Sequence, residues 1–229
     1  MTEATLIENW RATLVRVEAA ALRYGRDRES VRLLAISKGQ PAEALREIAQ
    51  AGQREFGENY LQEALAKIAS LSDLGLTWHF TGQIQGNKTR PIAEHFQWAH
   101  TVDRERIALR LNEQRPADLA PLNICVQVRL EDEPGKGGVE PRDLPALAAR
   151  IAELPRLRLR GLMCIPPPRD SFDEQRELFT RLQHLLDELN DHGYQMDTLS
   201  MGMSGDLDAA IAAGATIVRV GTAIFGERV

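Results

Sequence analysis

Apolar residues recur every three or four positions in the first part of the chain. They are Leu6, Trp10, Leu14, Val17 and Ala21. This spacing places the five side chains on one face of a helix, so the pattern predicts an amphipathic helix over 3–24 that ends near Gly25.

The rest of the chain alternates short apolar runs with stretches of helical periodicity. The apolar runs lie at 31–36, 54–58, 77–82, 96–102, 123–130, 156–165, 196–201 and 216–221. The helical stretches lie at 42–51, 60–70, 87–95, 104–114, 142–153, 173–191 and 205–213. Eight strands separated by helices, without an internal linker rich in Pro, Gly or Ser, predict an α/β fold with one parallel (β/α)8 TIM barrel.

The expected barrel spans 1–229 as a single domain, with 1–25 as an extra N-terminal helix. Only eight residues follow Gly221, which is too few for an eighth outer helix, so the N-terminal helix is expected to pack near that place. The alternative architecture is a doubly wound open sheet. It needs a Gly-rich first turn, whereas the first strand is followed by SKGQP.

In such a barrel, residues just past the carboxyl ends of the strands face a common mouth. They are Lys38, Glu58, Asn59 and the ranges 79–83, 129–136, 163–166, 201–204 and 219–222. Lys38 ends an apolar strand, and burial there would lower the pKa of its ammonium group. The resulting neutral amine could form a Schiff base with a carbonyl compound.

Further candidate ligand-binding residues lie in MGMSGD at 201–206 and VRVGTAIFG at 218–226. Ser204 lies where a helix begins, so it is either an ordinary N-cap or a ligand for an anion. Gly221 lies after the eighth strand, where a tight turn and a close approach of phosphate to the backbone both suit glycine. With Lys38, these residues suggest a ligand that carries a phosphate and an aldehyde. Pyridoxal 5′-phosphate (PLP) fits that description.

Several motifs resemble the pyridoxal phosphate homeostasis protein family, in order from about residue 31 onward. They are ISK at 36–38, FGENYLQE at 56–63, WHFTGQIQGNK at 78–88, GLMCIP at 161–166, LSMGMSGDLDAAI at 199–211 and VRVGTAIFG at 218–226. The resemblance implies a barrel related to the N-terminal domain of alanine racemase, with PLP held as an internal aldimine.

The resemblance also implies site residues by motif position. Lys38 would be the aldimine lysine, and Ser204, Gly221 and Thr222 would bind the phosphate. Arg219 would face the pyridine nitrogen. The residues expected to line the mouth near the ring are Asn59, His79 and Met201.

The chain departs from the family pattern near the first and fifth strands. Gln40 stands where the family has a second lysine, and Arg129 and Glu131 stand where it commonly has Asn and Ser. Lys136 and Gly138 of the following Lys-x-Gly are kept. For Lys136 a solvated loop charge, and for Glu58 a helix-capping carboxylate, are alternative interpretations.

Composition narrows the function classes. Lys+Arg 28 and Asp+Glu 33 leave a net charge of −5, and without a strongly basic tract the chain is not expected to bind nucleic acid. The N-terminal segment is interrupted by charges, and no stretch is long and apolar enough to cross a bilayer. Cys125 and Cys164 lie in apolar runs, and the histidines form no HExxH or HxH pair. The expectation is a cytoplasmic protein with buried reduced thiols and no metal site.

The resemblance favours a monomeric carrier or buffer in PLP (vitamin B6) homeostasis that passes PLP to apo-enzymes, rather than an enzyme. An arginine at the pyridine nitrogen cannot supply the acid that helps PLP enzymes stabilise a carbanion. Alanine racemase takes its second base, a tyrosine, from an extra C-terminal domain, whereas this chain ends at Val229. Tyr24, Tyr60 and Tyr194 match no such motif. The alternatives are a PLP-dependent racemase or lyase and a cofactor-free Schiff-base aldolase.

Overall fold

The structure, a computed structural model, describes residues 5–131 and 137–226. Its sheet is a closed barrel in which all neighbouring strands are parallel and β8 pairs with β1. The strands are β1 Arg32–Ile36, β2 Glu55–Glu58, β3 Thr77–Phe80, β4 Trp98–Val102, β5 Leu122–Gln127, β6 Leu157–Met163, β7 Thr198–Ser200 and β8 Ile217–Val220. The predicted TIM barrel is confirmed, and the open doubly wound sheet is excluded.

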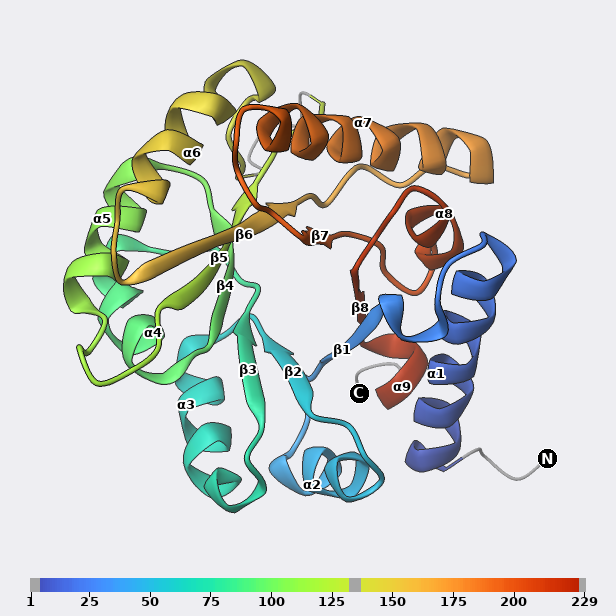
Figure 1. The fold of residues 1–229 in the computed structure, drawn as a ribbon. Coiled ribbons are helices and arrows are strands. Elements are labelled where there is room, and N and C mark those ends of the chain that lie inside the picture. The colour runs from blue at the N-terminus through green and yellow to red at the C-terminus, as the bar shows by residue number, and fades with distance from the viewer. Residues whose placement is uncertain (1–4, 132–136, 227–229) are drawn as a thin grey trace.

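The helices surround the barrel in chain order (Figure 1). They are α1 Leu6–Arg23, α2 Ala42–Gln50, α3 Leu61–Ser70, α4 Thr89–His95, α5 Glu105–Gln114, α6 Leu144–Ala152, α7 Phe172–Asp191, α8 Leu207–Ala212 and α9 Thr222–Phe225. Single turns of 3₁₀ helix lie at Arg28–Ser30, Ser72–Leu74, Gly86–Lys88 and Pro141–Asp143. No helix in the described ranges is long and apolar enough to span a membrane.

Several strands end earlier than the apolar runs predicted. The run at 123–130 pairs as a strand only to Gln127, and the run at 156–165 only to Met163. The residues beyond these ends turn into the loops of the barrel mouth, and the second loop enters a run of prolines at 166–168 that cannot donate to a ladder. The apolar character of the runs therefore continues past the sheet into the walls of the mouth.

Helix α1 takes the position expected for it. Thr5 and Glu8 form a capping box at its start, and its buried face packs against α2, α8 and α9. Trp10, on this face, donates from Nε1 to Gln53 Oε1 at 2.9 Å. After β8 the described chain forms only the one-turn helix α9, so α1 covers the neighbouring part of the barrel (Figure 1).

The amino ends of the strands close the barrel at the side opposite the mouth. Trp98 lies inside the barrel with Cys125 and Met163. The guanidinium carbons of Arg32 and Arg160 lie 5.0 and 4.8 Å from the centre of its ring. These cation–π contacts lie near the amino ends of β1 and β4, on the side of the barrel away from the mouth.

The two cysteines are free and buried, as the sequence predicted. Burial raises the pKa of each thiol, at Cys125 and at Cys164, to about 12. Both are therefore neutral and poor nucleophiles at physiological pH.

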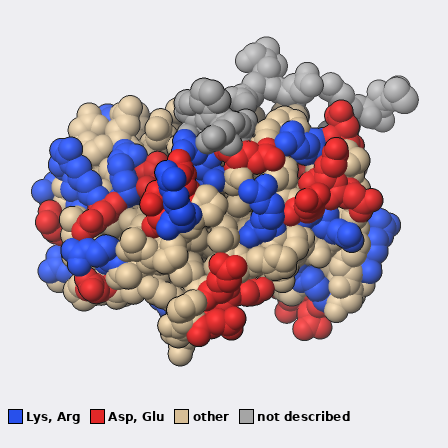
Figure 2. Space-filling view, turned by 90° about the horizontal axis from the view of Figure 1, so that it is seen from above, with Lys and Arg blue, Asp and Glu red and all other residues tan. Residues whose placement is uncertain are grey.

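The surface carries charges of both signs. On the face shown in Figure 2, Lys and Arg side chains alternate with Asp and Glu side chains over the described residues. This mixing agrees with the net charge of −5 and offers no continuous basic surface on this face.

Candidate functional site

A cavity of about 430 Å³ opens at the mouth of the barrel. It is lined from the carboxyl ends of six strands by Ile36, Lys38, Asn59, Thr81, Ile165, Met203, Ser204, Gly205, Arg219, Gly221 and Thr222. Six of the eight site residues predicted from the sequence therefore meet in one cavity. They are Lys38, Asn59, Ser204, Arg219, Gly221 and Thr222.

Lys38 is half-buried and lies in the turn that follows β1. The peptide groups on either side of it are held by α3. Lys67 Nζ donates to the carbonyl oxygen of Ser37 at 2.6 Å, and Gly39 N donates to Glu63 Oε1 at 2.6 Å. Gly39 has φ 76°, a left-handed conformation that glycine adopts without strain. The backbone that carries Lys38 is thus constrained on both sides.

The contacts of Lys67 and Glu63 belong to a buried ionic cluster beneath this turn. Lys67 Nζ donates to Glu58 Oε1 at 2.7 Å and also to Glu63 Oε1, and Ser37 Oγ donates to Glu58 Oε1 at 2.6 Å. Burial raises the pKa of the Glu58 carboxyl group, while the hydrogen bonds from Lys67 and Ser37 oppose that rise. The N-cap of α3 is Tyr60, so the interpretation of Glu58 as a helix cap is wrong.

Arg219 enters the cavity from β8 and is almost completely buried. Its Nη1 donates to Ser200 O at 2.6 Å and to Ser200 Oγ at 3.0 Å, and its Nη2 donates to Cys164 O at 2.9 Å. Burial lowers the pKa of the guanidinium, which nevertheless keeps its proton at neutral pH. Arg219 is therefore a fixed cation that can only donate hydrogen bonds.

The part of the cavity wall that follows β7 and β8, next to β1, is built from small residues. A Cβ at Gly221 would lie 3.1 Å from Ile36 O, so a larger residue there would crowd the backbone of β1. Ser204 O accepts a hydrogen bond from Arg16 Nη1 of α1 at 2.9 Å. The N-cap of α8 is Asp206, so the interpretation of Ser204 as a helix cap is wrong.

Two residues expected at the mouth lie elsewhere. His79 is fully buried inside the barrel, where it stacks on Trp98 at a centroid distance of 5.4 Å, and Met201 is fully buried in the main hydrophobic core. Thr81 and Met203 line the cavity in their place. Thr81 lies two residues beyond His79 and, by the two-residue alternation of a strand, keeps its orientation but reaches beyond the sheet. Met203 follows Gly202, whose φ of 90° turns the backbone after Met201.

Thr81 was within the range expected at the mouth but was not selected. It is buried, and its Oγ1 donates to Asn59 Oδ1 at 2.8 Å, which orients that amide in the cavity. The same two-residue periodicity, counted from the true end of the strand rather than from the end of the apolar run, would have identified it.

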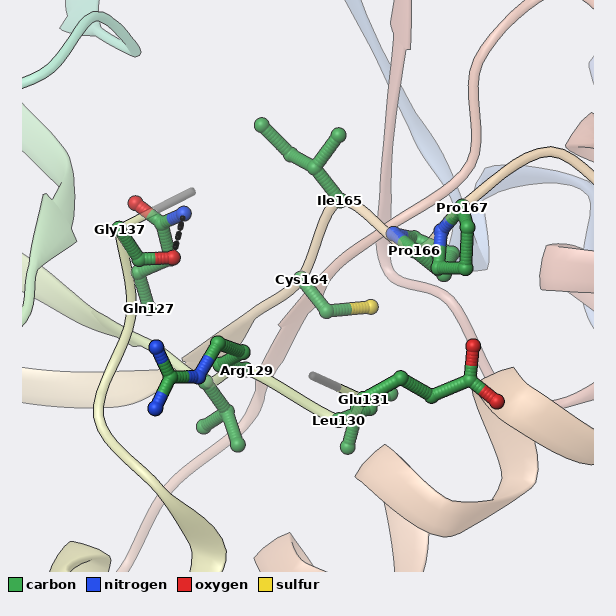
Figure 3. A pocket seen from close by; sticks show the side chains of 10 residues that line it. Gln127, Arg129, Leu130, Glu131, Gly137, Cys164, Ile165, Pro166 and Pro167 are labelled. Atoms are coloured by element: carbon green, nitrogen blue, oxygen red, sulfur yellow. Dashed lines mark hydrogen bonds between the residues drawn. The ribbon is translucent and has the colours of Figure 1, made fainter. Parts of the chain in front are cut away.

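The residues that depart from the family pattern after β5 line a separate narrow pocket beside Cys164 (Figure 3). Arg129 Nη2 binds Glu140 Oε1 at 2.8 Å, and Glu131 Oε2 binds Arg169 Nη2 at 2.7 Å. Their charges are therefore neutralised by side chains of this chain. Lys136, the remaining candidate in this loop, lies outside the described residues.

Comparison with known proteins gives concordant matches. The family model described as "Alanine racemase, N-terminal domain" matches residues 22–229. The chain is 58% identical over 225 residues to the pyridoxal phosphate homeostasis protein of Pseudomonas aeruginosa, a match that covers 98% of this chain and 96% of that protein.

Solved structures give matches of two kinds. PipY of Synechococcus elongatus PCC7942, in a structure with PLP bound, is 42% identical with a TM-score of 0.81, and the match covers 93% of this chain and 100% of PipY. Alanine racemase from Corynebacterium glutamicum is 16% identical with a TM-score of 0.67, over 95% of this chain and 60% of the racemase. At that identity the likeness concerns the fold alone.

Proposed function

This chain belongs to the pyridoxal phosphate homeostasis protein family, which carries the alanine racemase N-terminal domain, and from that premise we propose that it binds PLP at the barrel mouth. We further propose that it acts in the cytoplasm as a monomeric, non-catalytic carrier or buffer of this cofactor. The relative PipY, whose structure was solved with PLP bound, supports the choice of ligand.

The observation that carries the proposal is the meeting of three kinds of group in one cavity. PLP has an aldehyde, a phosphate and a pyridine nitrogen. The cavity offers the primary amine of Lys38, the small residues after β7 and β8, and the buried guanidinium of Arg219. The residues present therefore fit the cofactor. When bound, PLP supplies an aldehyde that reacts reversibly with primary amines.

Each residue then has a distinct role. Lys38 binds the aldehyde covalently, and the constrained turn around it directs its amine into the cavity. Ser204 and Thr222 donate hydrogen bonds to the phosphate, and the missing Cβ of Gly221 lets the phosphate approach the backbone. Arg219 donates to the pyridine nitrogen. Asn59, held by Thr81, contacts the ring.

The chemistry of the cavity favours a carrier over a racemase. An arginine that only donates hydrogen bonds leaves the pyridine nitrogen without a proton, which weakens the ring as an electron sink. Among the described residues that line the cavity, Lys38 is the only side chain of a type that commonly acts as a general acid or base. Racemisation needs acid–base groups on two faces of a substrate carbon, and only one is provided there.

Covalent attachment is tested by reduction. Treatment of the purified protein with borohydride and peptide mass mapping should place one pyridoxyl-phosphate group on Lys38, and Lys38→Ala should abolish the visible chromophore. Lys88→Ala, which removes a lysine outside the cavity, is the matched control and should keep it. An adduct on Lys67 or Lys88 in the wild-type protein would contradict the assignment.

The proposed contact of Ser204 with the phosphate is tested by comparing two ligands. Ser204→Ala should weaken binding of PLP by about 1.5–3 kcal/mol, because it removes a hydrogen bond to a charged group. Binding of pyridoxal, which has no phosphate, should barely change. An equal loss for both ligands would show that Ser204 acts on the structure and not on the phosphate.

The carrier role is tested by two parallel assays. The PLP-loaded protein should reactivate an apo PLP-dependent enzyme, and it should not exchange the Cα proton of common L-amino acids with solvent deuterium at an enzymatic rate. Exchange near the ~10 s⁻¹ that is typical of enzymes, without reactivation of the apo-enzyme, would favour a racemase instead.

A further inference from the structure

A line of buried polar side chains runs from Arg219 into the interior of the barrel. Ser200 Oγ, which accepts from Arg219 Nη1, lies 2.8 Å from His100 Nδ1, and His100 Nε2 lies 2.9 Å from His79 Nδ1. Ser200, His100 and His79 are all fully buried. The four side chains come from β8, β7, β4 and β3, so only closure of the barrel brings them into line.

The donors and acceptors along this line determine its direction. The guanidinium of Arg219 has donors only, so Ser200 Oγ accepts from it and has its own proton left to donate. His100 Nδ1 is the acceptor within reach, which leaves the proton of His100 on Nε2. His100 Nε2–H then donates to His79 Nδ1, and the proton of His79 lies on Nε2.

The opposite direction leaves two groups badly placed. If His100 Nδ1 donated to Ser200, the hydroxyl proton of Ser200 would have no acceptor among the described residues, at a site without exposure to water. His79 Nε2 would also present a lone pair toward the carboxylate of Glu55, whose Oε1 lies 4.0 Å away. In the first direction, His79 Nε2 carries a proton that the carboxylate attracts, although Nε2 has no hydrogen-bond partner among the described residues.

The charges around the two histidines agree with neutral rings. Burial is the main cause that lowers the pKa of His100 to about 3, and Arg219 and Arg32 add to it. Burial also lowers the pKa of His79 well below its ordinary value, with smaller effects of His100 and Arg32.

We propose that Ser200 and His100 are positioning residues for Arg219, and that the hydrogen bonds from Arg219 through Ser200 and His100 to His79 run in this one direction. Arg219 Nη1 donates to Ser200 O and Ser200 Oγ, and Nη2 donates to Cys164 O. Nε and the second N–H of Nη2 make no hydrogen bond to the described residues, so they are available to the cavity that Arg219 lines. The inference rests on the proposed function only for the contact with PLP.

The direction of the line is tested on the wild-type protein by long-range ¹H–¹⁵N correlation spectra of the histidine rings. Both His100 and His79 should be neutral at pH 7, with the proton on Nε2 and none on Nδ1. A proton on Nδ1 of His100, or a doubly protonated ring at pH 7, would overturn the proposal. This measurement needs neither a variant nor an identified ligand.

The positioning role is tested with PLP and a 1-deaza analogue, in which CH replaces the pyridine nitrogen. Ser200→Ala should weaken binding of PLP about tenfold but binding of the analogue less than about twofold, because only PLP has a nitrogen for Arg219 to contact. His100→Ala should behave like Ser200→Ala. His100→Asn, which keeps an acceptor for Ser200, should restore most of the affinity.

The outcomes separate the two proposals. Equal losses for PLP and the analogue in Ser200→Ala would show a merely structural effect and overturn the positioning role. Failure of the wild-type protein to bind PLP at all would refute the proposed function, while the tautomers of His100 and His79 would still decide the direction of the line.

Discussion

Lys67 is the buried cation on which the turn around Lys38 depends. Lys67→Met should lower the free energy of unfolding by about 3–5 kcal/mol, because it leaves the fully buried carboxyl group of Glu58 without its cationic partner. Urea denaturation at pH 7 measures the change. Since Lys67 also holds Ser37 O, the variant should lose PLP as well as stability.

Arg46→Met is the matched control for Lys67→Met. Arg46 pairs with Asp73 on the surface, where side-chain exposures are 35% and 59%. Solvent screens such a pair, so the expected loss is much smaller than that for Lys67→Met. A loss for Lys67→Met no larger than that of the control would show that the cluster is not held by its buried cation.

At the scale of elements, the largest buried side chain of α1 is that of Trp10. Trp10→Ala should lower the free energy of unfolding by about 3–5 kcal/mol, because it opens a cavity between α1 and the barrel and leaves buried Gln53 Oε1 without its donor. Val15→Ala, on the exposed face of the same helix, should change stability by no more than about 0.5 kcal/mol. Similar losses for both variants would contradict the packing of α1 described above.

At the scale of the whole molecule, the buried histidines make stability depend on pH. A histidine whose pKa is lowered by folding binds its proton more readily in the unfolded chain, so stability is lost as the pH falls below 6.5. For His100, with a pKa of about 3 in the folded state, the loss between pH 7 and pH 5 amounts to about 2 kcal/mol. His79 adds to the loss in the same direction.

Urea denaturation at pH 7 and pH 5 measures this dependence. His100→Asn should weaken it, because the variant removes one of the two titrating groups. His184→Gln, at an exposed position, should leave it unchanged. Glu58, whose pKa is raised by burial, acts in the opposite direction, because a carboxyl group that binds its proton more readily in the folded chain loses stability as the pH rises.

Much of the fold was determined by the sequence alone. The two periodicities, alternating along the chain, predicted every strand of the barrel and helices α1 to α8, because strands buried on both faces and amphipathic helices have distinct patterns. Their positions at the predicted strand ends brought Lys38, Ser204 and Gly221 together before any contact was known, and the family resemblance added the role of Arg219. These residues share one cavity because parallel strands end at the same edge.

The tertiary structure decided which residues reach the cavity and which remain beneath it. His79 lies within β3, and Met201 follows β7 directly but packs into the hydrophobic core. The true strand ends depend on pairing with neighbours that the local pattern does not contain. The contacts around Lys67 and the line of hydrogen bonds from Arg219 to His79 also depend on the tertiary structure. Apart from the contacts of Lys67 with Glu58 and Glu63, these contacts join residues about twenty or more positions apart in the chain, so their geometry exists only once the strands have come together in the barrel.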